Sequence, residues 1–314
     1  FILKLLQNPK IFVFSLINMI ILVFLGTISQ GELGLYLTQK IYFSSWIHWF
    51  FFIPLPAGRL LMVVIFINLF CLLFKKSLWK YKKIGILVVH FGALLLFFGG
   101  GITAYFSYEG QMTIKEGESS NYIEDYYLKE LAFLPSSDRE IIFNQEQLIE
   151  LDSHELDYSN VNFQIKILSF LSNSKPISRI QKCAECRGIF KSFELVELES
   201  QKEFEQNNSS VIFEITGIND VIDGIYASMV FEKDNNELII DDQMITILLR
   251  PERTEIPFEI QLVDFKEVLH PGTDIAKSYS SEIILNNQDF GRQVLISMNE
   301  PLRHREYTFF QSAF

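Results

Sequence analysis

The chain has 314 residues, with 27 Lys and Arg against 38 Asp and Glu, for a formal net charge of −11. This length permits one or two domains, and the acidic balance argues against nucleic acid as a partner. The charge is unevenly spread: residues 1–106 carry nine basic side chains and one acid, a net of +8, which leaves −19 for residues 107–314. The first part is typical of a membrane domain, and the second of an acidic domain outside the bilayer.

Three apolar stretches predict transmembrane helices at about residues 11–28, 58–74 and 84–106. The third runs for 23 residues without a formal charge. At 1.5 Å per residue it makes about 34 Å of helix, enough to cross a hydrocarbon core of roughly 30 Å. The first is at the short end of this range, and the second follows the turn Pro54-Leu55-Pro56. Residues 1–106 are therefore predicted to be a membrane domain with three spans.

The orientation follows from the lysines. Residues 75–83, between the second and third predicted spans, hold five lysines and no acid, and Lys4 and Lys10 precede the first. Short loops this basic stay in the cytoplasm. We expect a multi-pass protein of the plasma (inner) membrane, with a cytoplasmic N-terminus and residues 107–314 in the periplasm or outside the cell.

The connection between the first two spans is then expected at the outer face. Its aromatic, nearly uncharged middle, Ser44–Phe52, suits the headgroup boundary, where Trp prefers to lie. His48 is most simply an interfacial residue, and the alternative is a ligand for haem or substrate at the outer face.

Residues 107–314 are predicted to form a mainly-β extracytoplasmic domain, because short runs of alternating apolar and polar residues are separated by polar turns. Many short strands favour an antiparallel sandwich or an open barrel. Two segments, Asn121–Phe133 and Asp138–Leu151, indicate helix instead. The predicted strands are Val161–Ile167, Val211–Ile215, Ala227–Phe231, Glu237–Ile240, Met244–Leu249, Phe258–Phe265, Ser281–Leu285, Gln293–Met298 and Tyr307–Gln311.

Cys183-Ala184-Glu185-Cys186 is a compact motif in this domain. Arg187 stands where a c-type haem attachment site needs His, which argues against covalent haem here. A zinc site would need two more ligands, and the sequence has no second cysteine pair. Outside the cytoplasm a disulfide is the expected state. A structural disulfide and a redox pair for thiol exchange both stay open.

Several stretches, in this order, carry a family resemblance. They are Gly26–Gln30, Tyr42–Trp46, Pro54–Leu60, Ser107–Gly110, Ile114–Ser119, Pro257-Phe258, Asp264-Phe265, Pro271–Thr273, Met298–Arg303 and Tyr307–Ser312. Together with the predicted topology, they resemble the ResB (CcsB) family of cytochrome c biogenesis proteins. The likeness spans nearly the whole chain, with a gap at about residues 125–255.

The resemblance implies a function. Such a protein works with the polytopic membrane protein CcsA, carries haem b out of the cytoplasm and presents it to apocytochrome c for thioether attachment. In the family, a histidine in the third span corresponds to His90 and is an axial ligand of the haem in transit. The second axial ligand would come from the partner, whose tryptophan-rich haem-binding segment has no counterpart here. A thiol-reducing thioredoxin-like protein is a further candidate partner.

Family members continue into another span after the outer domain. We therefore expect the chain to be truncated before a further transmembrane helix, with the front part of a fused ResB–CcsA polypeptide as one form.

His90 is a functional hypothesis on physical grounds too, because an ionisable residue inside a membrane span is costly. The alternative is a histidine that donates to a backbone carbonyl, to Asn18 or to Asn68. Gly85, Gly92 and Gly99 recur every seven residues, so we expect this glycine face to pack on another span and His90 to face away from it.

Arg59, at the outer end of the second span, is a candidate for a haem propionate, since Arg favours carboxylates. Reaching for lipid headgroups is the alternative.

Two other functions remain open: a membrane-anchored receptor or sensor with an outer ligand-binding domain, and a thiol–disulfide protein that uses Cys183 and Cys186. No catalytic triad, phosphate-binding loop or paired-carboxylate site is evident in the sequence. We expect a non-catalytic or co-catalytic subunit of a cytochrome c synthase (haem lyase) complex, and the enzyme question stays open.

Overall fold

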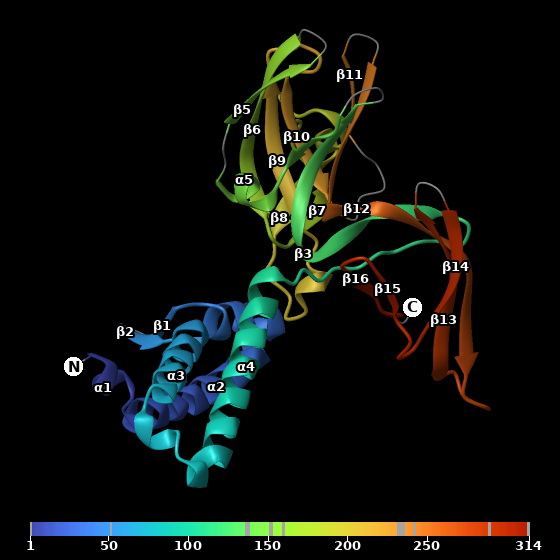
Figure 1. Cartoon of the computed structure of the whole chain (residues 1–314). Helices are drawn as coiled ribbons and strands as arrows, with labels where there is room; N and C mark the ends of the chain where they lie inside the picture. Colours follow the sequence, from blue (N-terminus) through green and yellow to red (C-terminus); the bar gives the residue numbers. More distant parts are fainter. Residues whose placement is uncertain are drawn as a thin grey trace. The chain divides into compact units, whose positions relative to one another are not determined.

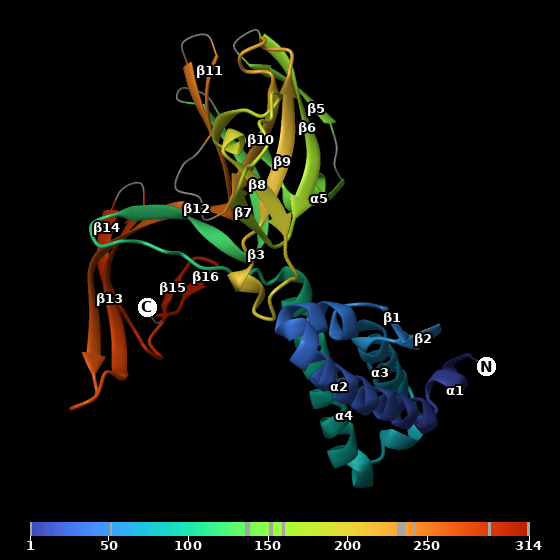
Figure 2. The ribbon, with the colours of Figure 1, turned by 180° about the vertical axis from the view of Figure 1, so that it is seen from behind.

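The computed structural model describes residues 2–50, 52–135, 139–150, 153–158, 161–230, 236–240, 243–287 and 290–312. It divides into two compact units, drawn in Figures 1 and 2. The helical unit comprises Phe1–Tyr108 with Ser172–Lys175 and Glu197–Asn208. The β unit comprises Glu109–Leu171, Pro176–Val196 and Ser209–Phe314.

The helical unit contains two stretches long and apolar enough to cross a membrane, Pro9–Phe43 and Tyr81–Phe106, and the shorter apolar helix Gly58–Leu73. The elements of the helical unit are α1 (Ile2–Leu6), α2 (Pro9–Thr38), η1 (Gln39–Phe43), β1 (Ile47–Phe50), β2 (Ile53–Pro56), α3 (Gly58–Leu73), η2 (Lys76–Leu78), η3 (Tyr81–Lys83) and α4 (Ile84–Phe106). Helix α4 has the bounds predicted for the third span.

Helix α2 contains the first predicted span, at about residues 11–28, continues beyond it and folds back on itself. Gly34 breaks it with φ 77° and ψ 172°. A Cβ atom on Gly26 would lie 3.0 Å from the Phe43 ring and 3.7 Å from the Thr38 methyl group. In a straight helix, residues 26 and 38 would be about 18 Å apart along the axis. The helical segment after the break therefore packs back on the first one.

Helix α3 lies at the centre of the helical unit. Ile65 and Leu69 form a buried cluster with Leu94 of α4, and Phe12 of α2 packs against it. The Asn68 amide donates to the carbonyls of Leu6 and Asn8, which ties α1 to α3.

The β unit is built from two sheets of antiparallel strands with a shared core. One sheet has the order β10-β9-β6-β5, and the other β14-β13-β12-β3-β4 with β11 on β12. Leu131 and Phe133 of the second sheet pack in one cluster with Ile165 and Phe213 of the first. The strands are β3 (Ser119–Pro135), β4 (Ile141–Phe143), β5 (Ser153–Tyr158), β6 (Val161–Leu171), β7 (Ser174–Ser178), β8 (Phe193–Glu197), β9 (Ser210–Thr216), β10 (Gly224–Met229), β11 (Asn236–Ile240), β12 (Gln243–Leu269), β13 (Ala276–Asn287), β14 (Phe290–Ser297), β15 (Leu302–His304) and β16 (Tyr307–Phe309); the short helices are α5 (Gln145–Glu150) and η4 (Gly188–Lys191). The short helix η5 (Phe204–Gln206) lies in the segment Glu197–Asn208, which belongs to the helical unit.

Most predicted strands are found, but β12 joins two of them, Met244–Leu249 and Phe258–Phe265. Its second half belongs to a separate apolar cluster with β13 and β14, which includes Ile260 and Ile283. The long strands β3 and β12 thus run through both cores. Between the cores, buried Arg250 of β12 forms an ion pair with buried Glu130 of β3 at 2.7 Å.

The helix predicted at Asn121–Phe133 is wrong, because this segment is strand β3. Leu131, Ala132 and Phe133 are consecutive and all buried, so the strand is covered on both faces and lacks the alternation that identifies a half-exposed strand. Pairing with β12 decides its conformation. Of the other predicted helix, Asp138–Leu151, only α5 is helical and β4 is a strand; its end residues Asp138 and Leu151 lie outside the described residues.

Candidate functional site

His90 is the seventh residue of α4, nearly two turns beyond its start. Its Nδ1 lies 2.8 Å from the carbonyl oxygen of Ile86, one turn earlier in the same helix. A carbonyl oxygen only accepts hydrogen bonds, so Nδ1–H is the donor, and in a neutral imidazole this leaves the lone pair on Nε2. Among the described residues no hydrogen bond engages Nε2. Donation to a backbone carbonyl is the bond that the structural alternative expected for His90. A metal-binding histidine makes the same kind of bond through one ring N–H and offers its other nitrogen to the metal.

The packed face of α4 is not the glycine face. Leu94 is buried against Ile65 and Leu69 of α3, and Ala93 and Phe97 pack around them. His90 precedes Ala93 and Leu94 by three and four residues and therefore shares their side of the helix. It is half-buried.

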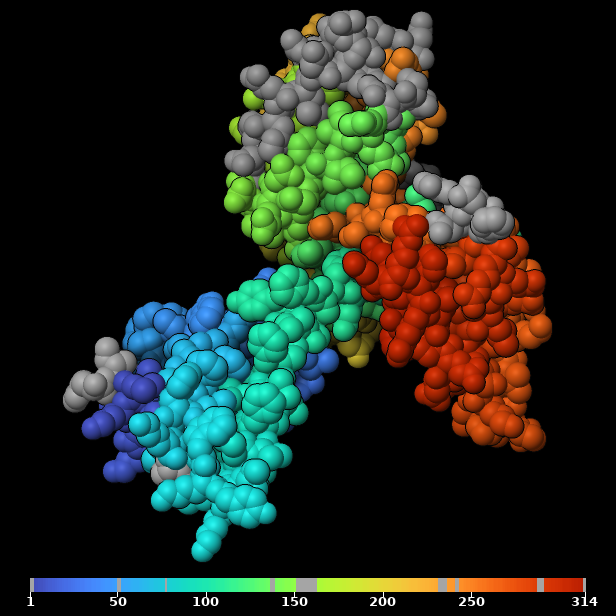
Figure 3. Space-filling model, viewed as in Figure 1, coloured from blue at the N-terminus to red at the C-terminus, as the bar shows by residue number. Residues whose placement is uncertain are grey.

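Gly85, Gly92 and Gly99 lie on an open side of α4: a Cβ added at any of them would have no described atom within 4 Å. The expectation that they pack on another span, with His90 facing away, was wrong. Large apolar side chains make the contact with α3 because glycine has no side chain to bury there. In the space-filling view, atoms of α4 lie uncovered along its length (Figure 3).

Arg59 and His90 are not brought together. Arg59 is the second residue of α3, with an exposed side chain, and α3 and α4 run in opposite directions (Figure 1). Leu69, which packs in one cluster with Leu94 of α4, is ten residues further along α3, about 15 Å at 1.5 Å per residue. Arg59 therefore lies toward the other end of the helical unit.

His48 lies on the hairpin β1–β2, next to η1. Its ring is 4.2 Å from the Tyr42 ring, and the Tyr42 hydroxyl is 2.7 Å from Ser29 Oγ. Burial lowers the pKa of the His48 imidazole below its usual value. Trp49 and Phe52 of the same hairpin are exposed, Phe52 to 92%.

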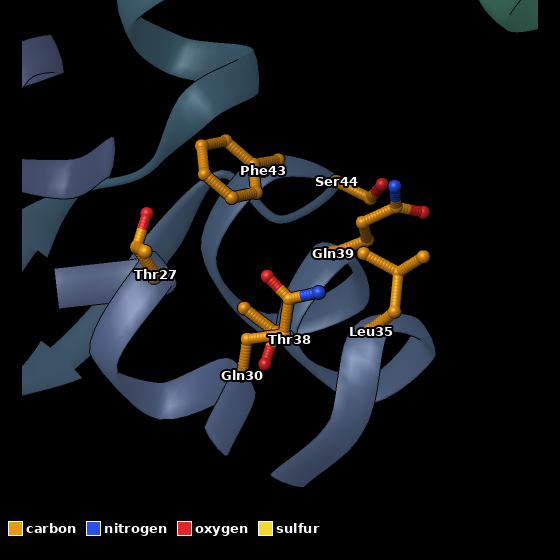
Figure 4. Close-up of a pocket in the computed structure, with 8 residues that line it drawn as sticks. Thr27, Gln30, Leu35, Thr38, Gln39, Phe43 and Ser44 are labelled. Atoms are coloured by element: carbon orange, nitrogen blue, oxygen red, sulfur yellow. The ribbon is translucent and has the colours of Figure 1, made fainter. Parts of the chain in front are cut away.

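A cavity lies inside the fold-back of α2, and the sequence analysis gave its residues no binding role, although Thr27, Gln30 and Ser44 belong to the stretches that carry the family resemblance. The cavity has a volume of about 240 Å³ and is lined by Thr27, Gln30 and Thr38 among others (Figure 4). The break at Gly34 creates it, and an isolated glycine inside a helical pattern was the available sequence indication.

Cys183 and Cys186 form a disulfide, with Cα atoms 5.4 Å apart. Cys186 is 2% exposed and packs with Phe190 and Ala227, whereas Cys183 is only partly buried. The Arg187 guanidinium donates to the carbonyls of Ala184, Cys186, Asp220 and Val221 and so holds the loop in place. A buried sulfur in a braced loop favours a structural disulfide, and an attacking thiolate could reach only Cys183.

The described residues contain no group of three or more His, Cys, Asp or Glu side chains that could hold a metal ion. For haem as cargo, the fitting feature of this chain is the unengaged Nε2 of His90, which can supply one axial bond.

The comparisons with known proteins agree with the resemblance. A profile of the ResB-like family matches residues 80–160 and 222–314, more than half of the chain. Protein NrfI of Wolinella succinogenes is 24% identical over 258 residues, which are 81% of this chain and 26% of NrfI. The chain thus spans about a quarter of the length of this curated relative. The profile match includes α4 with His90 and leaves out the Cys183–Cys186 loop. By this match over most of its length, the chain belongs to the ResB-like family.

Proposed function

We propose that this chain serves in cytochrome c biogenesis as a haem-handling subunit. With a CcsA-type partner, it moves haem across the membrane and presents it to apocytochrome c. Membership of the ResB-like family supports the general role. The specific role in haem handling rests on one observation: Nε2 of His90, on an apolar and uncharged helix, makes no hydrogen bond with any described residue.

The proposed topology has three spans, α2, α3 and α4. The five lysines of residues 75–83 hold the α3–α4 connection in the cytoplasm, so the β unit lies outside as an antiparallel sandwich. Helix α3 has 16 residues, about 24 Å of helix, which is short for a bilayer. A short span is accommodated by local thinning of the bilayer at modest cost.

His90 lies six residues past Ile84, about 9 Å along the helix from the cytoplasmic end of α4. Haem that enters from the cytoplasm meets this side chain early. The bond from Nδ1–H to the Ile86 carbonyl fixes the tautomer and strengthens Nε2 as an iron ligand. The partner supplies the second axial ligand. Arg59 interacts with a haem propionate or a lipid headgroup at the outer end of α3.

The test is the haem content of His90→Ala. The full-length protein is purified gently with its membrane partner, and haem is quantified from the Soret band and the pyridine haemochrome spectrum. We expect wild type to carry haem and His90→Ala to lose it, with recovery on addition of free imidazole, which can occupy the vacated position.

Val89→Ala is the matched control, because Val89 is the neighbouring residue of α4 and is 69% exposed. It should keep its haem. The proposal fails if His90→Ala retains a normal haem spectrum and cytochrome c maturation continues at the wild-type rate.

A further inference from the structure

A small cavity lined by hydroxyl, amide and apolar groups lies inside the fold-back of α2. Thr27 and Gln30 line it on the first helical segment, and Thr38, Gln39 and Ser44 line it after the break (Figure 4). Phe43 covers it on the side where Gly26 leaves room for the ring. No lining side chain carries a formal charge, and five of them can donate hydrogen bonds.

The hydroxyl group of Thr38 in this cavity lacks the hydrogen-bond partner that a helical threonine usually has. Thr38 is 2% exposed, and its Oγ1 is buried with no hydrogen-bond partner among the described residues. A helical threonine commonly donates to the carbonyl four residues earlier, as Thr27 does to Val23 and Thr103 does to Gly99. For Thr38 that residue is Gly34, where the backbone leaves the helical conformation. The break therefore frees a buried hydroxyl, and a buried polar group without a partner is costly.

The break is itself fixed by a close backbone contact. A Cβ atom on Gly34 would lie 1.8 Å from the carbonyl oxygen of Lys202, and φ at Gly34 is +77°. Both features require glycine. The Tyr36 ring also lies 4.6 Å from the Phe204 ring. Segment Glu197–Asn208 thus holds α2 in the conformation that forms the cavity.

The chemistry of the lining selects a hydrogen-bond acceptor. Hydroxyl and amide groups bind carboxylate and phosphate oxygens well, and the lining has no carboxylate to repel an anion. The charged residues of the sequence between Lys10 and Lys75 are Glu32, Lys40 and Arg59, a net of +1. The adjacent hairpin β1–β2 exposes Trp49 and Phe52, as interfacial segments do.

We propose that this cavity binds an oxyanion of an amphipathic molecule, with the Thr38 hydroxyl as its buried donor. Two sources share this chemistry: a haem propionate and a phospholipid headgroup. The haem source rests on the proposed function, and the lipid source does not.

The experiment compares Thr38→Val with Thr103→Val in the full-length protein in nanodiscs containing phosphatidylglycerol. Valine has nearly the shape of threonine. The Thr103 hydroxyl of α4 already donates to the Gly99 carbonyl and does not line the cavity, so Thr103→Val is a matched control outside the proposed site. Thr38→Ser restores the hydroxyl and should behave as wild type. The probes are haem, haem dimethyl ester, whose propionates cannot ionise, and retained phospholipid counted by native mass spectrometry.

If the ligand is a propionate, Thr38→Val weakens haem binding about tenfold, and it leaves binding of the dimethyl ester unchanged. If the ligand is a lipid headgroup, Thr38→Val instead loses a retained phosphatidylglycerol that Thr103→Val keeps. Failure of the proposed function removes haem binding from all variants but leaves this lipid comparison intact. The inference is overturned if Thr38→Val matches Thr103→Val with all three probes, because the cavity then holds only water.

Discussion

Replacement of Gly34 by Ala should release segment Glu197–Asn208 from α2. Contacts of a Cβ atom below 3.0 Å essentially do not occur, so the Lys202 carbonyl, 1.8 Å from the added atom, must move by about 1.2 Å. Such overpacking costs about 1–3 kcal/mol. The positive φ adds about 1–2 kcal/mol for a residue with a side chain. Detachment of the segment relieves the clash but gives up the contact between Tyr36 and Phe204, worth about 0.5–1.5 kcal/mol.

The assay is limited proteolysis with an enzyme that cleaves after lysine, read by mass spectrometry at the exposed Lys202. We expect cleavage of Gly34→Ala at Lys202 to be at least tenfold faster than in wild type, since about 1.4 kcal/mol corresponds to a factor of ten in the open population. Gly31→Ala is the control, because a Cβ atom there would have no described neighbour within 4 Å. It should be cleaved as slowly as wild type. Equal cleavage rates for Gly34→Ala and Gly31→Ala would refute the reasoning.

Three further predictions concern the β unit. Arg250→Met leaves Glu130 as a buried, unpaired charge and should lower the free energy of unfolding, measured in urea, by about 3–5 kcal/mol. Most of this loss should disappear in the double variant with Glu130→Met. A loss below about 1 kcal/mol for the single variant would contradict the ion-pair argument. Burial raises the pKa of Tyr226 to about 12, so the unfolded state releases the phenol proton at a lower pH than the folded state does. The free energy of unfolding should therefore fall by about 2 kcal/mol as pH rises from 10 to 12. In Tyr226→Phe, measured at the same pH values, this fall should be smaller by the same amount. Cys183→Ser opens the small loop closed by Cys186 and should lower stability by about 2 kcal/mol while cytochrome c maturation continues; if maturation stops in a folded variant, the redox role returns.

The predictions from sequence were best where a local property decides the outcome. The 23 uncharged residues of Ile84–Phe106 form one helix because their own backbone bonds satisfy every interior peptide group, whatever surrounds them. Strands with regular alternation, such as Val161–Ile167, were also found, because one face meets the core and the other meets solvent. His90 became a candidate on the same local ground, as a titratable side chain in an apolar stretch.

The amino-acid sequence by itself determined the division into an apolar basic part and an acidic β-rich part, the bounds of α4 and most of the strands. Tertiary structure decided the fold-back at Gly34, the strand at Asn121–Phe133 and the side of α4 that packs on α3. Each of these depends on groups far away in the chain: the Lys202 carbonyl for Gly34, strand β12 for β3, and Ile65 and Leu69 for α4. A local pattern records how a residue partitions between water and an apolar phase, but it does not record which distant backbone or side chain will fill the space beside it.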